Sequence, residues 1–177
     1  MNDIALKKYV TLTDTSEYDN VLHFLKPKNI FLGKKMDVQS MMYINVKYCF
    51  KLLPTVNKWE DICELFNLCF GVDNEDFWNA SIVEFYSARN FLIEELKKTA
   101  ENEIKLLSGN QKDSDKWKRA GVNRLDKFSD MISLDRLGQR YGMYPPDLGR
   151  KPYSEIIYLS AMIKTDNEIN TAFSEIK

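Results

Sequence analysis

The sequence contains very little of what most catalytic and metal sites are built from. Histidine occurs once, at His23, in a chain of 177 residues. A Ser-His-Asp or Cys-His arrangement would have to use this one residue, and metal sites that need several histidines are excluded. The chain also lacks a P-loop and a G-x-G-x-x-G motif, the usual glycine-rich cradles for phosphate. We therefore expect no enzymatic activity, no catalytic or cofactor-binding residue, no cofactor and no metal ion.

Cysteine, glycine and proline are also scarce. The three cysteines, Cys49, Cys63 and Cys69, are odd in number and are not at C-x-x-C spacing. This pattern favours reduced thiols in a folded core over a disulfide framework or a zinc site. Seven Gly and five Pro predict few long loops. No segment approaches the run of about 18 apolar residues that a membrane-spanning helix needs, and the first ten residues lack a signal-peptide core.

The net charge of −1 argues against a protein that coats nucleic acid, because phosphate neutralisation dominates such binding. The charge is unevenly distributed, however: the net is −6 from Lys58 to Leu107 and +4 from Lys112 to Lys151. Solvated helix faces would explain both segments. Alternatively, a chain with a negative and a positive end would suit head-to-tail packing of copies.

Helical periodicity dominates most of the chain. Apolar residues recur at three- and four-residue steps from Val38, and Pro54 should stop that helix. A capping box at Ser81 and Glu84 precedes the longest helix, which should run for about 26 residues, or roughly 39 Å, to the turn at 108–110. The fold class that follows is all-α. It is an irregular bundle of six or seven helices around one long central helix.

Further helix starts and ends are marked by capping residues. Asn57 with Glu60 and Asp115 are expected N-caps, Gly71 and Gly142 suit helix C-termini, and Thr165 with Glu168 should open a last helix. Residues 1–36 read as an N-terminal extended arm or short hairpin, with a turn near 26–29. Residues 37–177 then form the helical domain, which the polar linker 109–114 would subdivide into 37–110 and 114–177.

A turn at Pro145-Pro146 is surrounded by tyrosines and followed by two basic residues. Packing of the turn onto the bundle would account for the aromatic rings. Alternatively, tyrosines of this kind anchor partner chains, because they are enriched at interface hot spots. The candidate partner contacts are Tyr141, Tyr144, Tyr153, Arg150 and Lys151.

The segment SLDRLGQRYGMYPPDLGRK also has the outline of a helix-turn-helix, which makes a nucleic-acid-binding protein the alternative function. The second helix of such a motif places its N-terminal residues in the major groove. In this chain it would begin at Pro145-Pro146 and meet Gly149 and Pro152 within little more than one turn. It would carry no Asn, Gln or Arg to read base edges.

The region from 117 to 164 resembles small helical proteins encoded among the morphogenesis genes of tailed bacteriophages. The matching residues are Trp117, Ala120-Gly121, Leu125, Phe128, Leu134, Leu137, Tyr141-Gly142, Pro146, Pro152-Tyr153, Ile156-Ile157 and Leu159. Similar proteins act as tail-assembly factors or as minor parts of the virion. The resemblance thus implies a structural or assembly protein of a phage tail, connector or cargo, located in the virion or the host cytoplasm. Its partners would be other virion or assembly proteins, together with further copies of itself.

Overall fold

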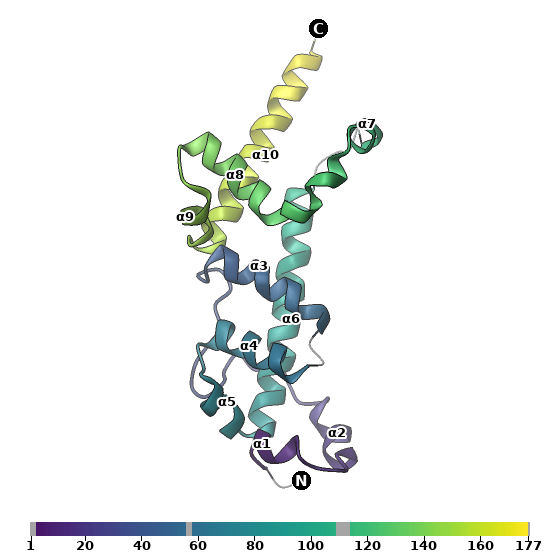
Figure 1. Ribbon diagram of the computed structural model, residues 1–177, viewed down its shortest axis with the longest axis vertical. Coiled ribbons are helices and arrows are strands. Elements are labelled where there is room, and N and C mark those ends of the chain that lie inside the picture. The colour runs from purple at the N-terminus through teal and green to yellow at the C-terminus, as the bar shows by residue number, and fades with distance from the viewer. Residues whose placement is uncertain (1–2, 56–57, 109–113, 177) are drawn as a thin grey trace. The chain divides into compact units, whose positions relative to one another are not determined.

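The computed structural model describes residues 3–55, 58–108 and 114–176. The described chain is mostly helical, with 72% of residues in helices, and only three isolated β-bridges occur in these ranges. The expected all-α fold is therefore confirmed. Figure 1 shows the elements in chain order: α1 (Leu6–Tyr9), α2 (Ser16–Leu22), α3 (Tyr43–Leu52), η1 (Leu53–Thr55), α4 (Trp59–Phe70), α5 (Asn74–Asn79), α6 (Ile82–Leu107), α7 (Ser114–Arg119), η2 (Val122–Phe128), α8 (Ser129–Tyr141), α9 (Pro145–Gly149) and α10 (Tyr153–Glu175).

The long helix predicted after Ser81 is confirmed as α6, which has 26 residues. The Ser81 hydroxyl caps it by accepting a hydrogen bond from the Glu84 amide at 3.3 Å. Gly71 and Gly142 take left-handed conformations, with φ of 63° and 66°, and end α4 and α8 as expected. The expected N-cap Asn57 and most of the linker 109–114 lie outside the described residues.

The described chain forms two compact units whose borders differ from those drawn from the sequence. The first unit comprises residues 1–38 and 48–100, and the second comprises 39–47 and 101–177. Both α3 and α6 therefore contribute residues to each unit. The border between the units does not coincide with the linker expected at 109–114, of which residues 109–113 lie outside the described ranges. Glu103 and Leu106, near the end of α6, instead contact Tyr153 and Lys164 of α10 within the second unit.

Aromatic side chains fill the core of the first unit. Phe66 lies at its centre, with its ring centroid 4.7 Å from that of Phe31, 5.1 Å from that of Phe85 and 5.3 Å from that of Phe77. All four rings are almost fully buried. Such ring pairs add to the hydrophobic contribution of the buried area, so this cluster stabilises the first unit.

Residues 1–36, for which an arm or hairpin was expected, instead contain α1 and α2 and contribute to this core. Leu6, Leu22 and Phe31 are fully buried, and the Leu6 amide donates to the Ala80 carbonyl at 2.8 Å. The hairpin is reduced to one bridge between Phe31 and Lys34. These three apolar residues are far apart in the sequence, and they are ordered because they pack against other elements of the first unit, including α5 and α6.

Two of the three cysteines, Cys49 and Cys69, lie in the core as expected, whereas Cys63 is only partly buried. The thiols of Cys49 and Cys69 are buried in the first unit with 3.8 Å between their sulfur atoms, and Cys63 is partly exposed and donates to Asn74. All three are free thiols. Burial raises the pKa of the Cys63 thiol, and the contact with Cys49 together with burial raises that of Cys69. Both shifts favour the neutral, unreactive thiol.

In the second unit, several helix boundaries differ from the predicted ones. The helix expected from Val38 begins only at Tyr43, because the backbone of 39–42 pairs with residues 151–154. The helix expected from Asp115 through Phe128 breaks at Gly121, whose φ is 85°. The two helices expected on either side of Thr165 are one helix, α10. Its 23 residues contain no Gly or Pro, and the Thr165 hydroxyl donates to the Ala161 carbonyl within the helix.

Gly138 allows a close approach between α8 and α9. A Cβ atom at this position would lie 2.6 Å from the Met143 carbonyl oxygen and 3.4 Å from Pro145 Cγ. In an exposed helix, alanine would be favoured over glycine by about 1 kcal/mol. We expect Gly138→Ala to act in the opposite direction and to lower the free energy of unfolding by about 1–3 kcal/mol, because the turn must shift to accommodate the methyl group.

Thermal and urea unfolding of the purified variant measure this effect. Gly149→Ala is the matched control, since its added Cβ would meet Leu134 Cδ1 at 3.5 Å, an ordinary contact distance. A Gly138→Ala protein as stable as the wild type or the control would contradict the close approach.

Candidate protein-binding surface

The start of α10 is fixed to the second unit through its backbone. The Tyr153 amide donates to the Met41 carbonyl at 2.8 Å, and the Ser154 amide donates to Gln39 at 3.1 Å. In return, the Tyr43 amide donates to the Lys151 carbonyl at 2.9 Å. Because Pro152 lacks an amide hydrogen and precedes the first helical residue, the helix starts here without losing a hydrogen bond. These contacts fix the start of α10 against residues 39–43.

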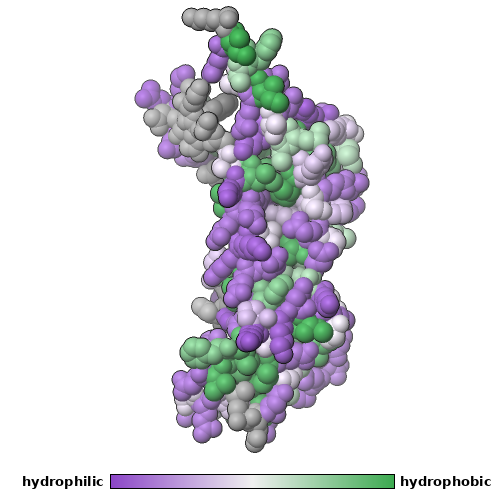
Figure 2. Space-filling view, turned by 180° about the vertical axis from the view of Figure 1, so that it is seen from behind, coloured by the Kyte–Doolittle hydropathy of each residue, from purple (hydrophilic) through white to green (hydrophobic). Residues whose placement is uncertain are grey.

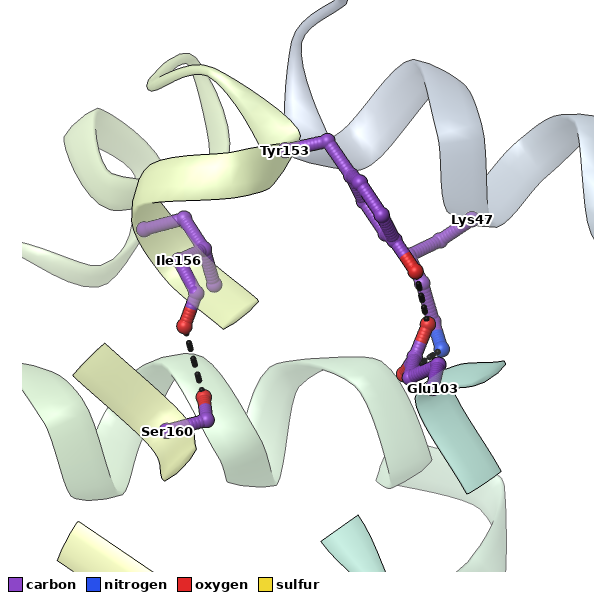
Figure 3. A network of polar contacts seen from close by, with 5 residues as sticks. All are labelled: Lys47, Glu103, Tyr153, Ile156 and Ser160. Carbon is purple, nitrogen blue, oxygen red and sulfur yellow. Dashed lines mark hydrogen bonds and ion pairs between the residues drawn. The ribbon is translucent and has the colours of Figure 1, made fainter. Parts of the chain in front are cut away.

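A polar network in the second unit adds side-chain contacts to this anchor (Figure 3). Glu103, near the end of α6, accepts hydrogen bonds from the Tyr153 hydroxyl at 2.9 Å and from the Lys47 ammonium at 2.8 Å. The Lys47 and Glu103 side chains are 20% and 12% exposed, so water screens the ion pair only partly. The ring of Tyr43 stacks on that of Tyr153, with 6.2 Å between the centroids. The network therefore joins α3, α6 and α10.

Burial, followed by the charge and hydrogen bond of Glu103, raises the pKa of the Tyr153 phenol. The folded protein therefore keeps this proton at a pH where the unfolded chain loses it. The resulting stability is fully present below pH 10, the ordinary value for tyrosine, and is lost as pH rises above it. We expect the free energy of unfolding to fall above pH 10 by about 1.4 kcal/mol per pH unit for each such phenol. Burial also raises the pKa of Tyr9, so this phenol contributes to the same decline in the free energy of unfolding.

Urea unfolding measured at several values between pH 9 and 12 checks this dependence. The Tyr153→Phe protein should show a shallower decline above pH 10, because the phenol of Tyr153 no longer contributes. If the two proteins decline with the same slope, Tyr153 does not hold its proton in the way described.

Beyond its anchored first turns, α10 exposes a continuous apolar face. The residues recur at steps of four and three along the helix, as in a helix that packs against another helix. We call this surface the α10 face; it consists of Tyr158, Met162, Thr165, Ile169, Ala172 and Phe173. Tyr158, Ile169 and Phe173 are 65%, 62% and 76% exposed. Figure 2 shows hydrophobic side chains standing on the surface at the end of α10 that carries the C terminus.

The α10 face is also slightly hollowed near its middle. Six residues line the hollow: Tyr158, Ala161, Met162, Thr165, Asp166 and Ile169. Apolar patches that remain open on a folded protein often mark sites where another molecule packs. The periodicity of this face was visible in the sequence. It was missed because the capping pattern at Thr165 suggested a new helix and divided the repeat in two.

The structure separates the five candidate partner contacts named from the sequence. Tyr144 is 68% exposed, and Tyr141 is also exposed. Arg150 and Lys151 reach solvent while pairing with Asp147 and Glu155. Tyr153 is the exception, because its ring is almost fully buried against Tyr43 and its hydroxyl is engaged by Glu103. It anchors α10 and is not part of the surface.

The possible sites for chemistry are few in the described residues. His23 is exposed, and its ring meets the Tyr86 ring edge-on at 5.9 Å. Across 3–55, 58–108 and 114–176, no three or more His, Cys, Asp and Glu side chains gather in a way that could hold a metal ion. Over the same ranges, no helix is both long and apolar enough to cross a membrane. Comparisons of the chain with protein-family models, with curated proteins and with solved structures find no match.

Proposed function

We propose that this protein is a structural or assembly protein that works through protein–protein contacts. The observation that carries the proposal is the α10 face, an open apolar stripe on a helix whose other end is fixed by Glu103 and Tyr153. A rigidly held helix with one apolar face is a common means of protein recognition, because the partner finds its contacts already in place.

The setting we propose is the virion of a tailed bacteriophage or its assembly in the host cytoplasm. The support for this setting is the resemblance carried by residues between 117 and 164, most of which belong to α8, α9 and α10. Tyr144 and Arg150, on the turn beside α9, would add polar and aromatic contacts to the surface.

The alternative, a helix-turn-helix protein, has less support. Its reading helix would be α9, which has only five residues and begins with two prolines. Recognition helices present several side chains to the major groove, and a helix of this length offers little more than one turn.

Mass spectrometry of purified phage particles and of their assembly intermediates tests the proposal. The protein should be found in one or both fractions at a fixed ratio to known particle proteins, and the ratio should survive nuclease treatment. Absence from both fractions, or release by nuclease, would refute a structural or assembly role.

A further inference from the structure

We infer that the α10 face binds a basic, partly apolar segment of a second copy of this chain, so that copies associate head to tail. The segment is Lys116–Met131, which covers most of α7, η2 and the start of α8. This inference rests on the proposed function and names the partner of the same surface.

The first argument is that this segment carries its own exposed apolar ridge. A 3₁₀ helix has three residues per turn, so residues three apart fall into one row. In η2 that row is Val122, Leu125 and Phe128, and Met131 continues it into α8. All four side chains are more than one third exposed. We call them the η2 ridge.

The second argument is charge. From Lys116 to Met131 the sequence holds five basic and two acidic residues, a net of +3, and from Tyr153 to Ile176 it holds one Lys and four acidic residues, a net of −3. Lys118, Arg119, Arg124 and Lys127 are exposed. The Lys127 ammonium lies 4.8 Å from the centroid of the Phe128 ring, so its charge sits directly beside the ridge. On α10, Asp166 pairs with Arg140 and Glu168 pairs with Lys164, so it is the opposite net charge of the two segments that would speed their encounter.

The η2 ridge is shorter than the α10 face and would cover most of it. From Tyr158 to Phe173 the α10 face extends about 22 Å at 1.5 Å per residue. The η2 ridge extends about 16 Å from Val122 to Met131, with 2.0 Å per residue in the 3₁₀ part. Each copy carries one of each surface, so the contact is between unlike patches. It can close into a ring or continue as a filament.

Two variants that each destroy one surface test the inference. Ile169→Asp places a charge in the α10 face, and Leu125→Asp places one in the η2 ridge. In sedimentation velocity, the wild-type chain should associate as its concentration rises. Each variant alone should associate at least about tenfold more weakly, which corresponds to about 1.4 kcal/mol. An equimolar mixture of the two should form a one-to-one dimer, because each variant keeps the surface that the other has lost.

Asn167→Asp is the matched control, since Asn167 is exposed on the opposite side of α10 and should leave association unchanged. Circular dichroism establishes that each variant stays helical. A second test exchanges two charges at the borders of the surfaces and leaves the apolar residues unchanged. Lys127→Glu and Glu168→Lys should each weaken association, and the chain carrying both changes should recover it.

Several results would overturn the inference. If Leu125→Asp still associates while Ile169→Asp does not, α10 pairs with α10. If the mixture of variants stays monomeric, the two surfaces do not meet. A wild-type chain that is monomeric at every concentration would show that the α10 face binds a different protein or its own η2 ridge. That last result would leave the proposed function standing, because mass spectrometry of the particles decides it separately.

Discussion

Replacing Phe66 with alanine is expected to lower the free energy of unfolding of the first unit by about 3–5 kcal/mol. The side chain is 1% exposed, and its ring contacts those of Phe31, Phe77 and Phe85. The substitution removes the apolar contacts of the ring and leaves a cavity that the neighbouring rings can fill only in part. Since whole domains are stable by only about 5–15 kcal/mol, the variant should be close to unfolding.

Urea unfolding followed by tryptophan fluorescence, in a chain whose Trp117 is replaced with Phe, measures this loss in the first unit. Trp59 and Trp78 lie in the first unit beside the aromatic cluster, with ring centroids 5.8 Å apart. Phe24→Ala is the matched control, because Phe24 belongs to the same unit and is 86% exposed. Equal unfolding midpoints for the two variants would contradict the central place given to Phe66.

Replacing Glu103 with alanine is expected to lower the free energy of unfolding of the second unit by about 2–4 kcal/mol. The change leaves the Tyr153 hydroxyl and the Lys47 ammonium without their carboxylate partner at a site that is mostly shielded from water. A polar group left without its hydrogen-bond partner in such a site lowers the free energy of unfolding by about 1–3 kcal/mol, and a charged group lowers it by more. Since Glu103 holds the beginning of α10, the loss should be felt first in that helix.

Hydrogen exchange locates the effect. The amides of the first turns of α10 should exchange faster in the Glu103→Ala protein, whereas the exchange of amides in the first unit should be unchanged. Glu101→Ala, an exposed position on the same helix, should leave both regions as in the wild type. Glu103→Gln should give an intermediate result, because the amide oxygen can still accept the Tyr153 hydrogen bond. Unchanged exchange in α10 would show that the network does not anchor it.

Local signals in the sequence predicted the helices well where the structure depends on local interactions. The N-cap Ser81 and the terminal glycines Gly71 and Gly142 act within a few residues of where they stand, so their effect can be derived from spacing alone. The Glu84 carboxylate, which was expected to complete a capping box, instead accepts a hydrogen bond from the Leu32 amide at 2.6 Å. Asp73, whose carboxylate accepts a hydrogen bond from the Asp76 amide at 2.8 Å, caps α5 through the same kind of local contact.

Features that depend on distant contacts could not be derived in this way. Glu103 and Tyr153 are 50 residues apart, and nothing in the sequence near either one indicates the other. For the same reason Tyr153 was taken for a surface residue, and residues 1–36 were taken for an arm. The division of α3 and α6 between two units also arises from long-range packing, which spacing does not reveal.

The α10 face lies between these two cases. Its repeat from Tyr158 to Phe173 is regular in the sequence, but a buried helix and an exposed one can show the same repeat. Only the structure shows that these side chains stay open to solvent, and this exposure is what connects the fold to the proposed function.

Photo-crosslinking from α10, in the cells where the protein works, tests the central claim most directly. A photoreactive phenylalanine analogue at Phe173 lies on the α10 face, whereas the same group at Asn167 lies on the opposite side of the helix. We expect the first to give a covalent adduct of discrete mass with a protein, and the second to give none. No protein adduct from Phe173, or equal adducts from both positions, would contradict a function built on this surface.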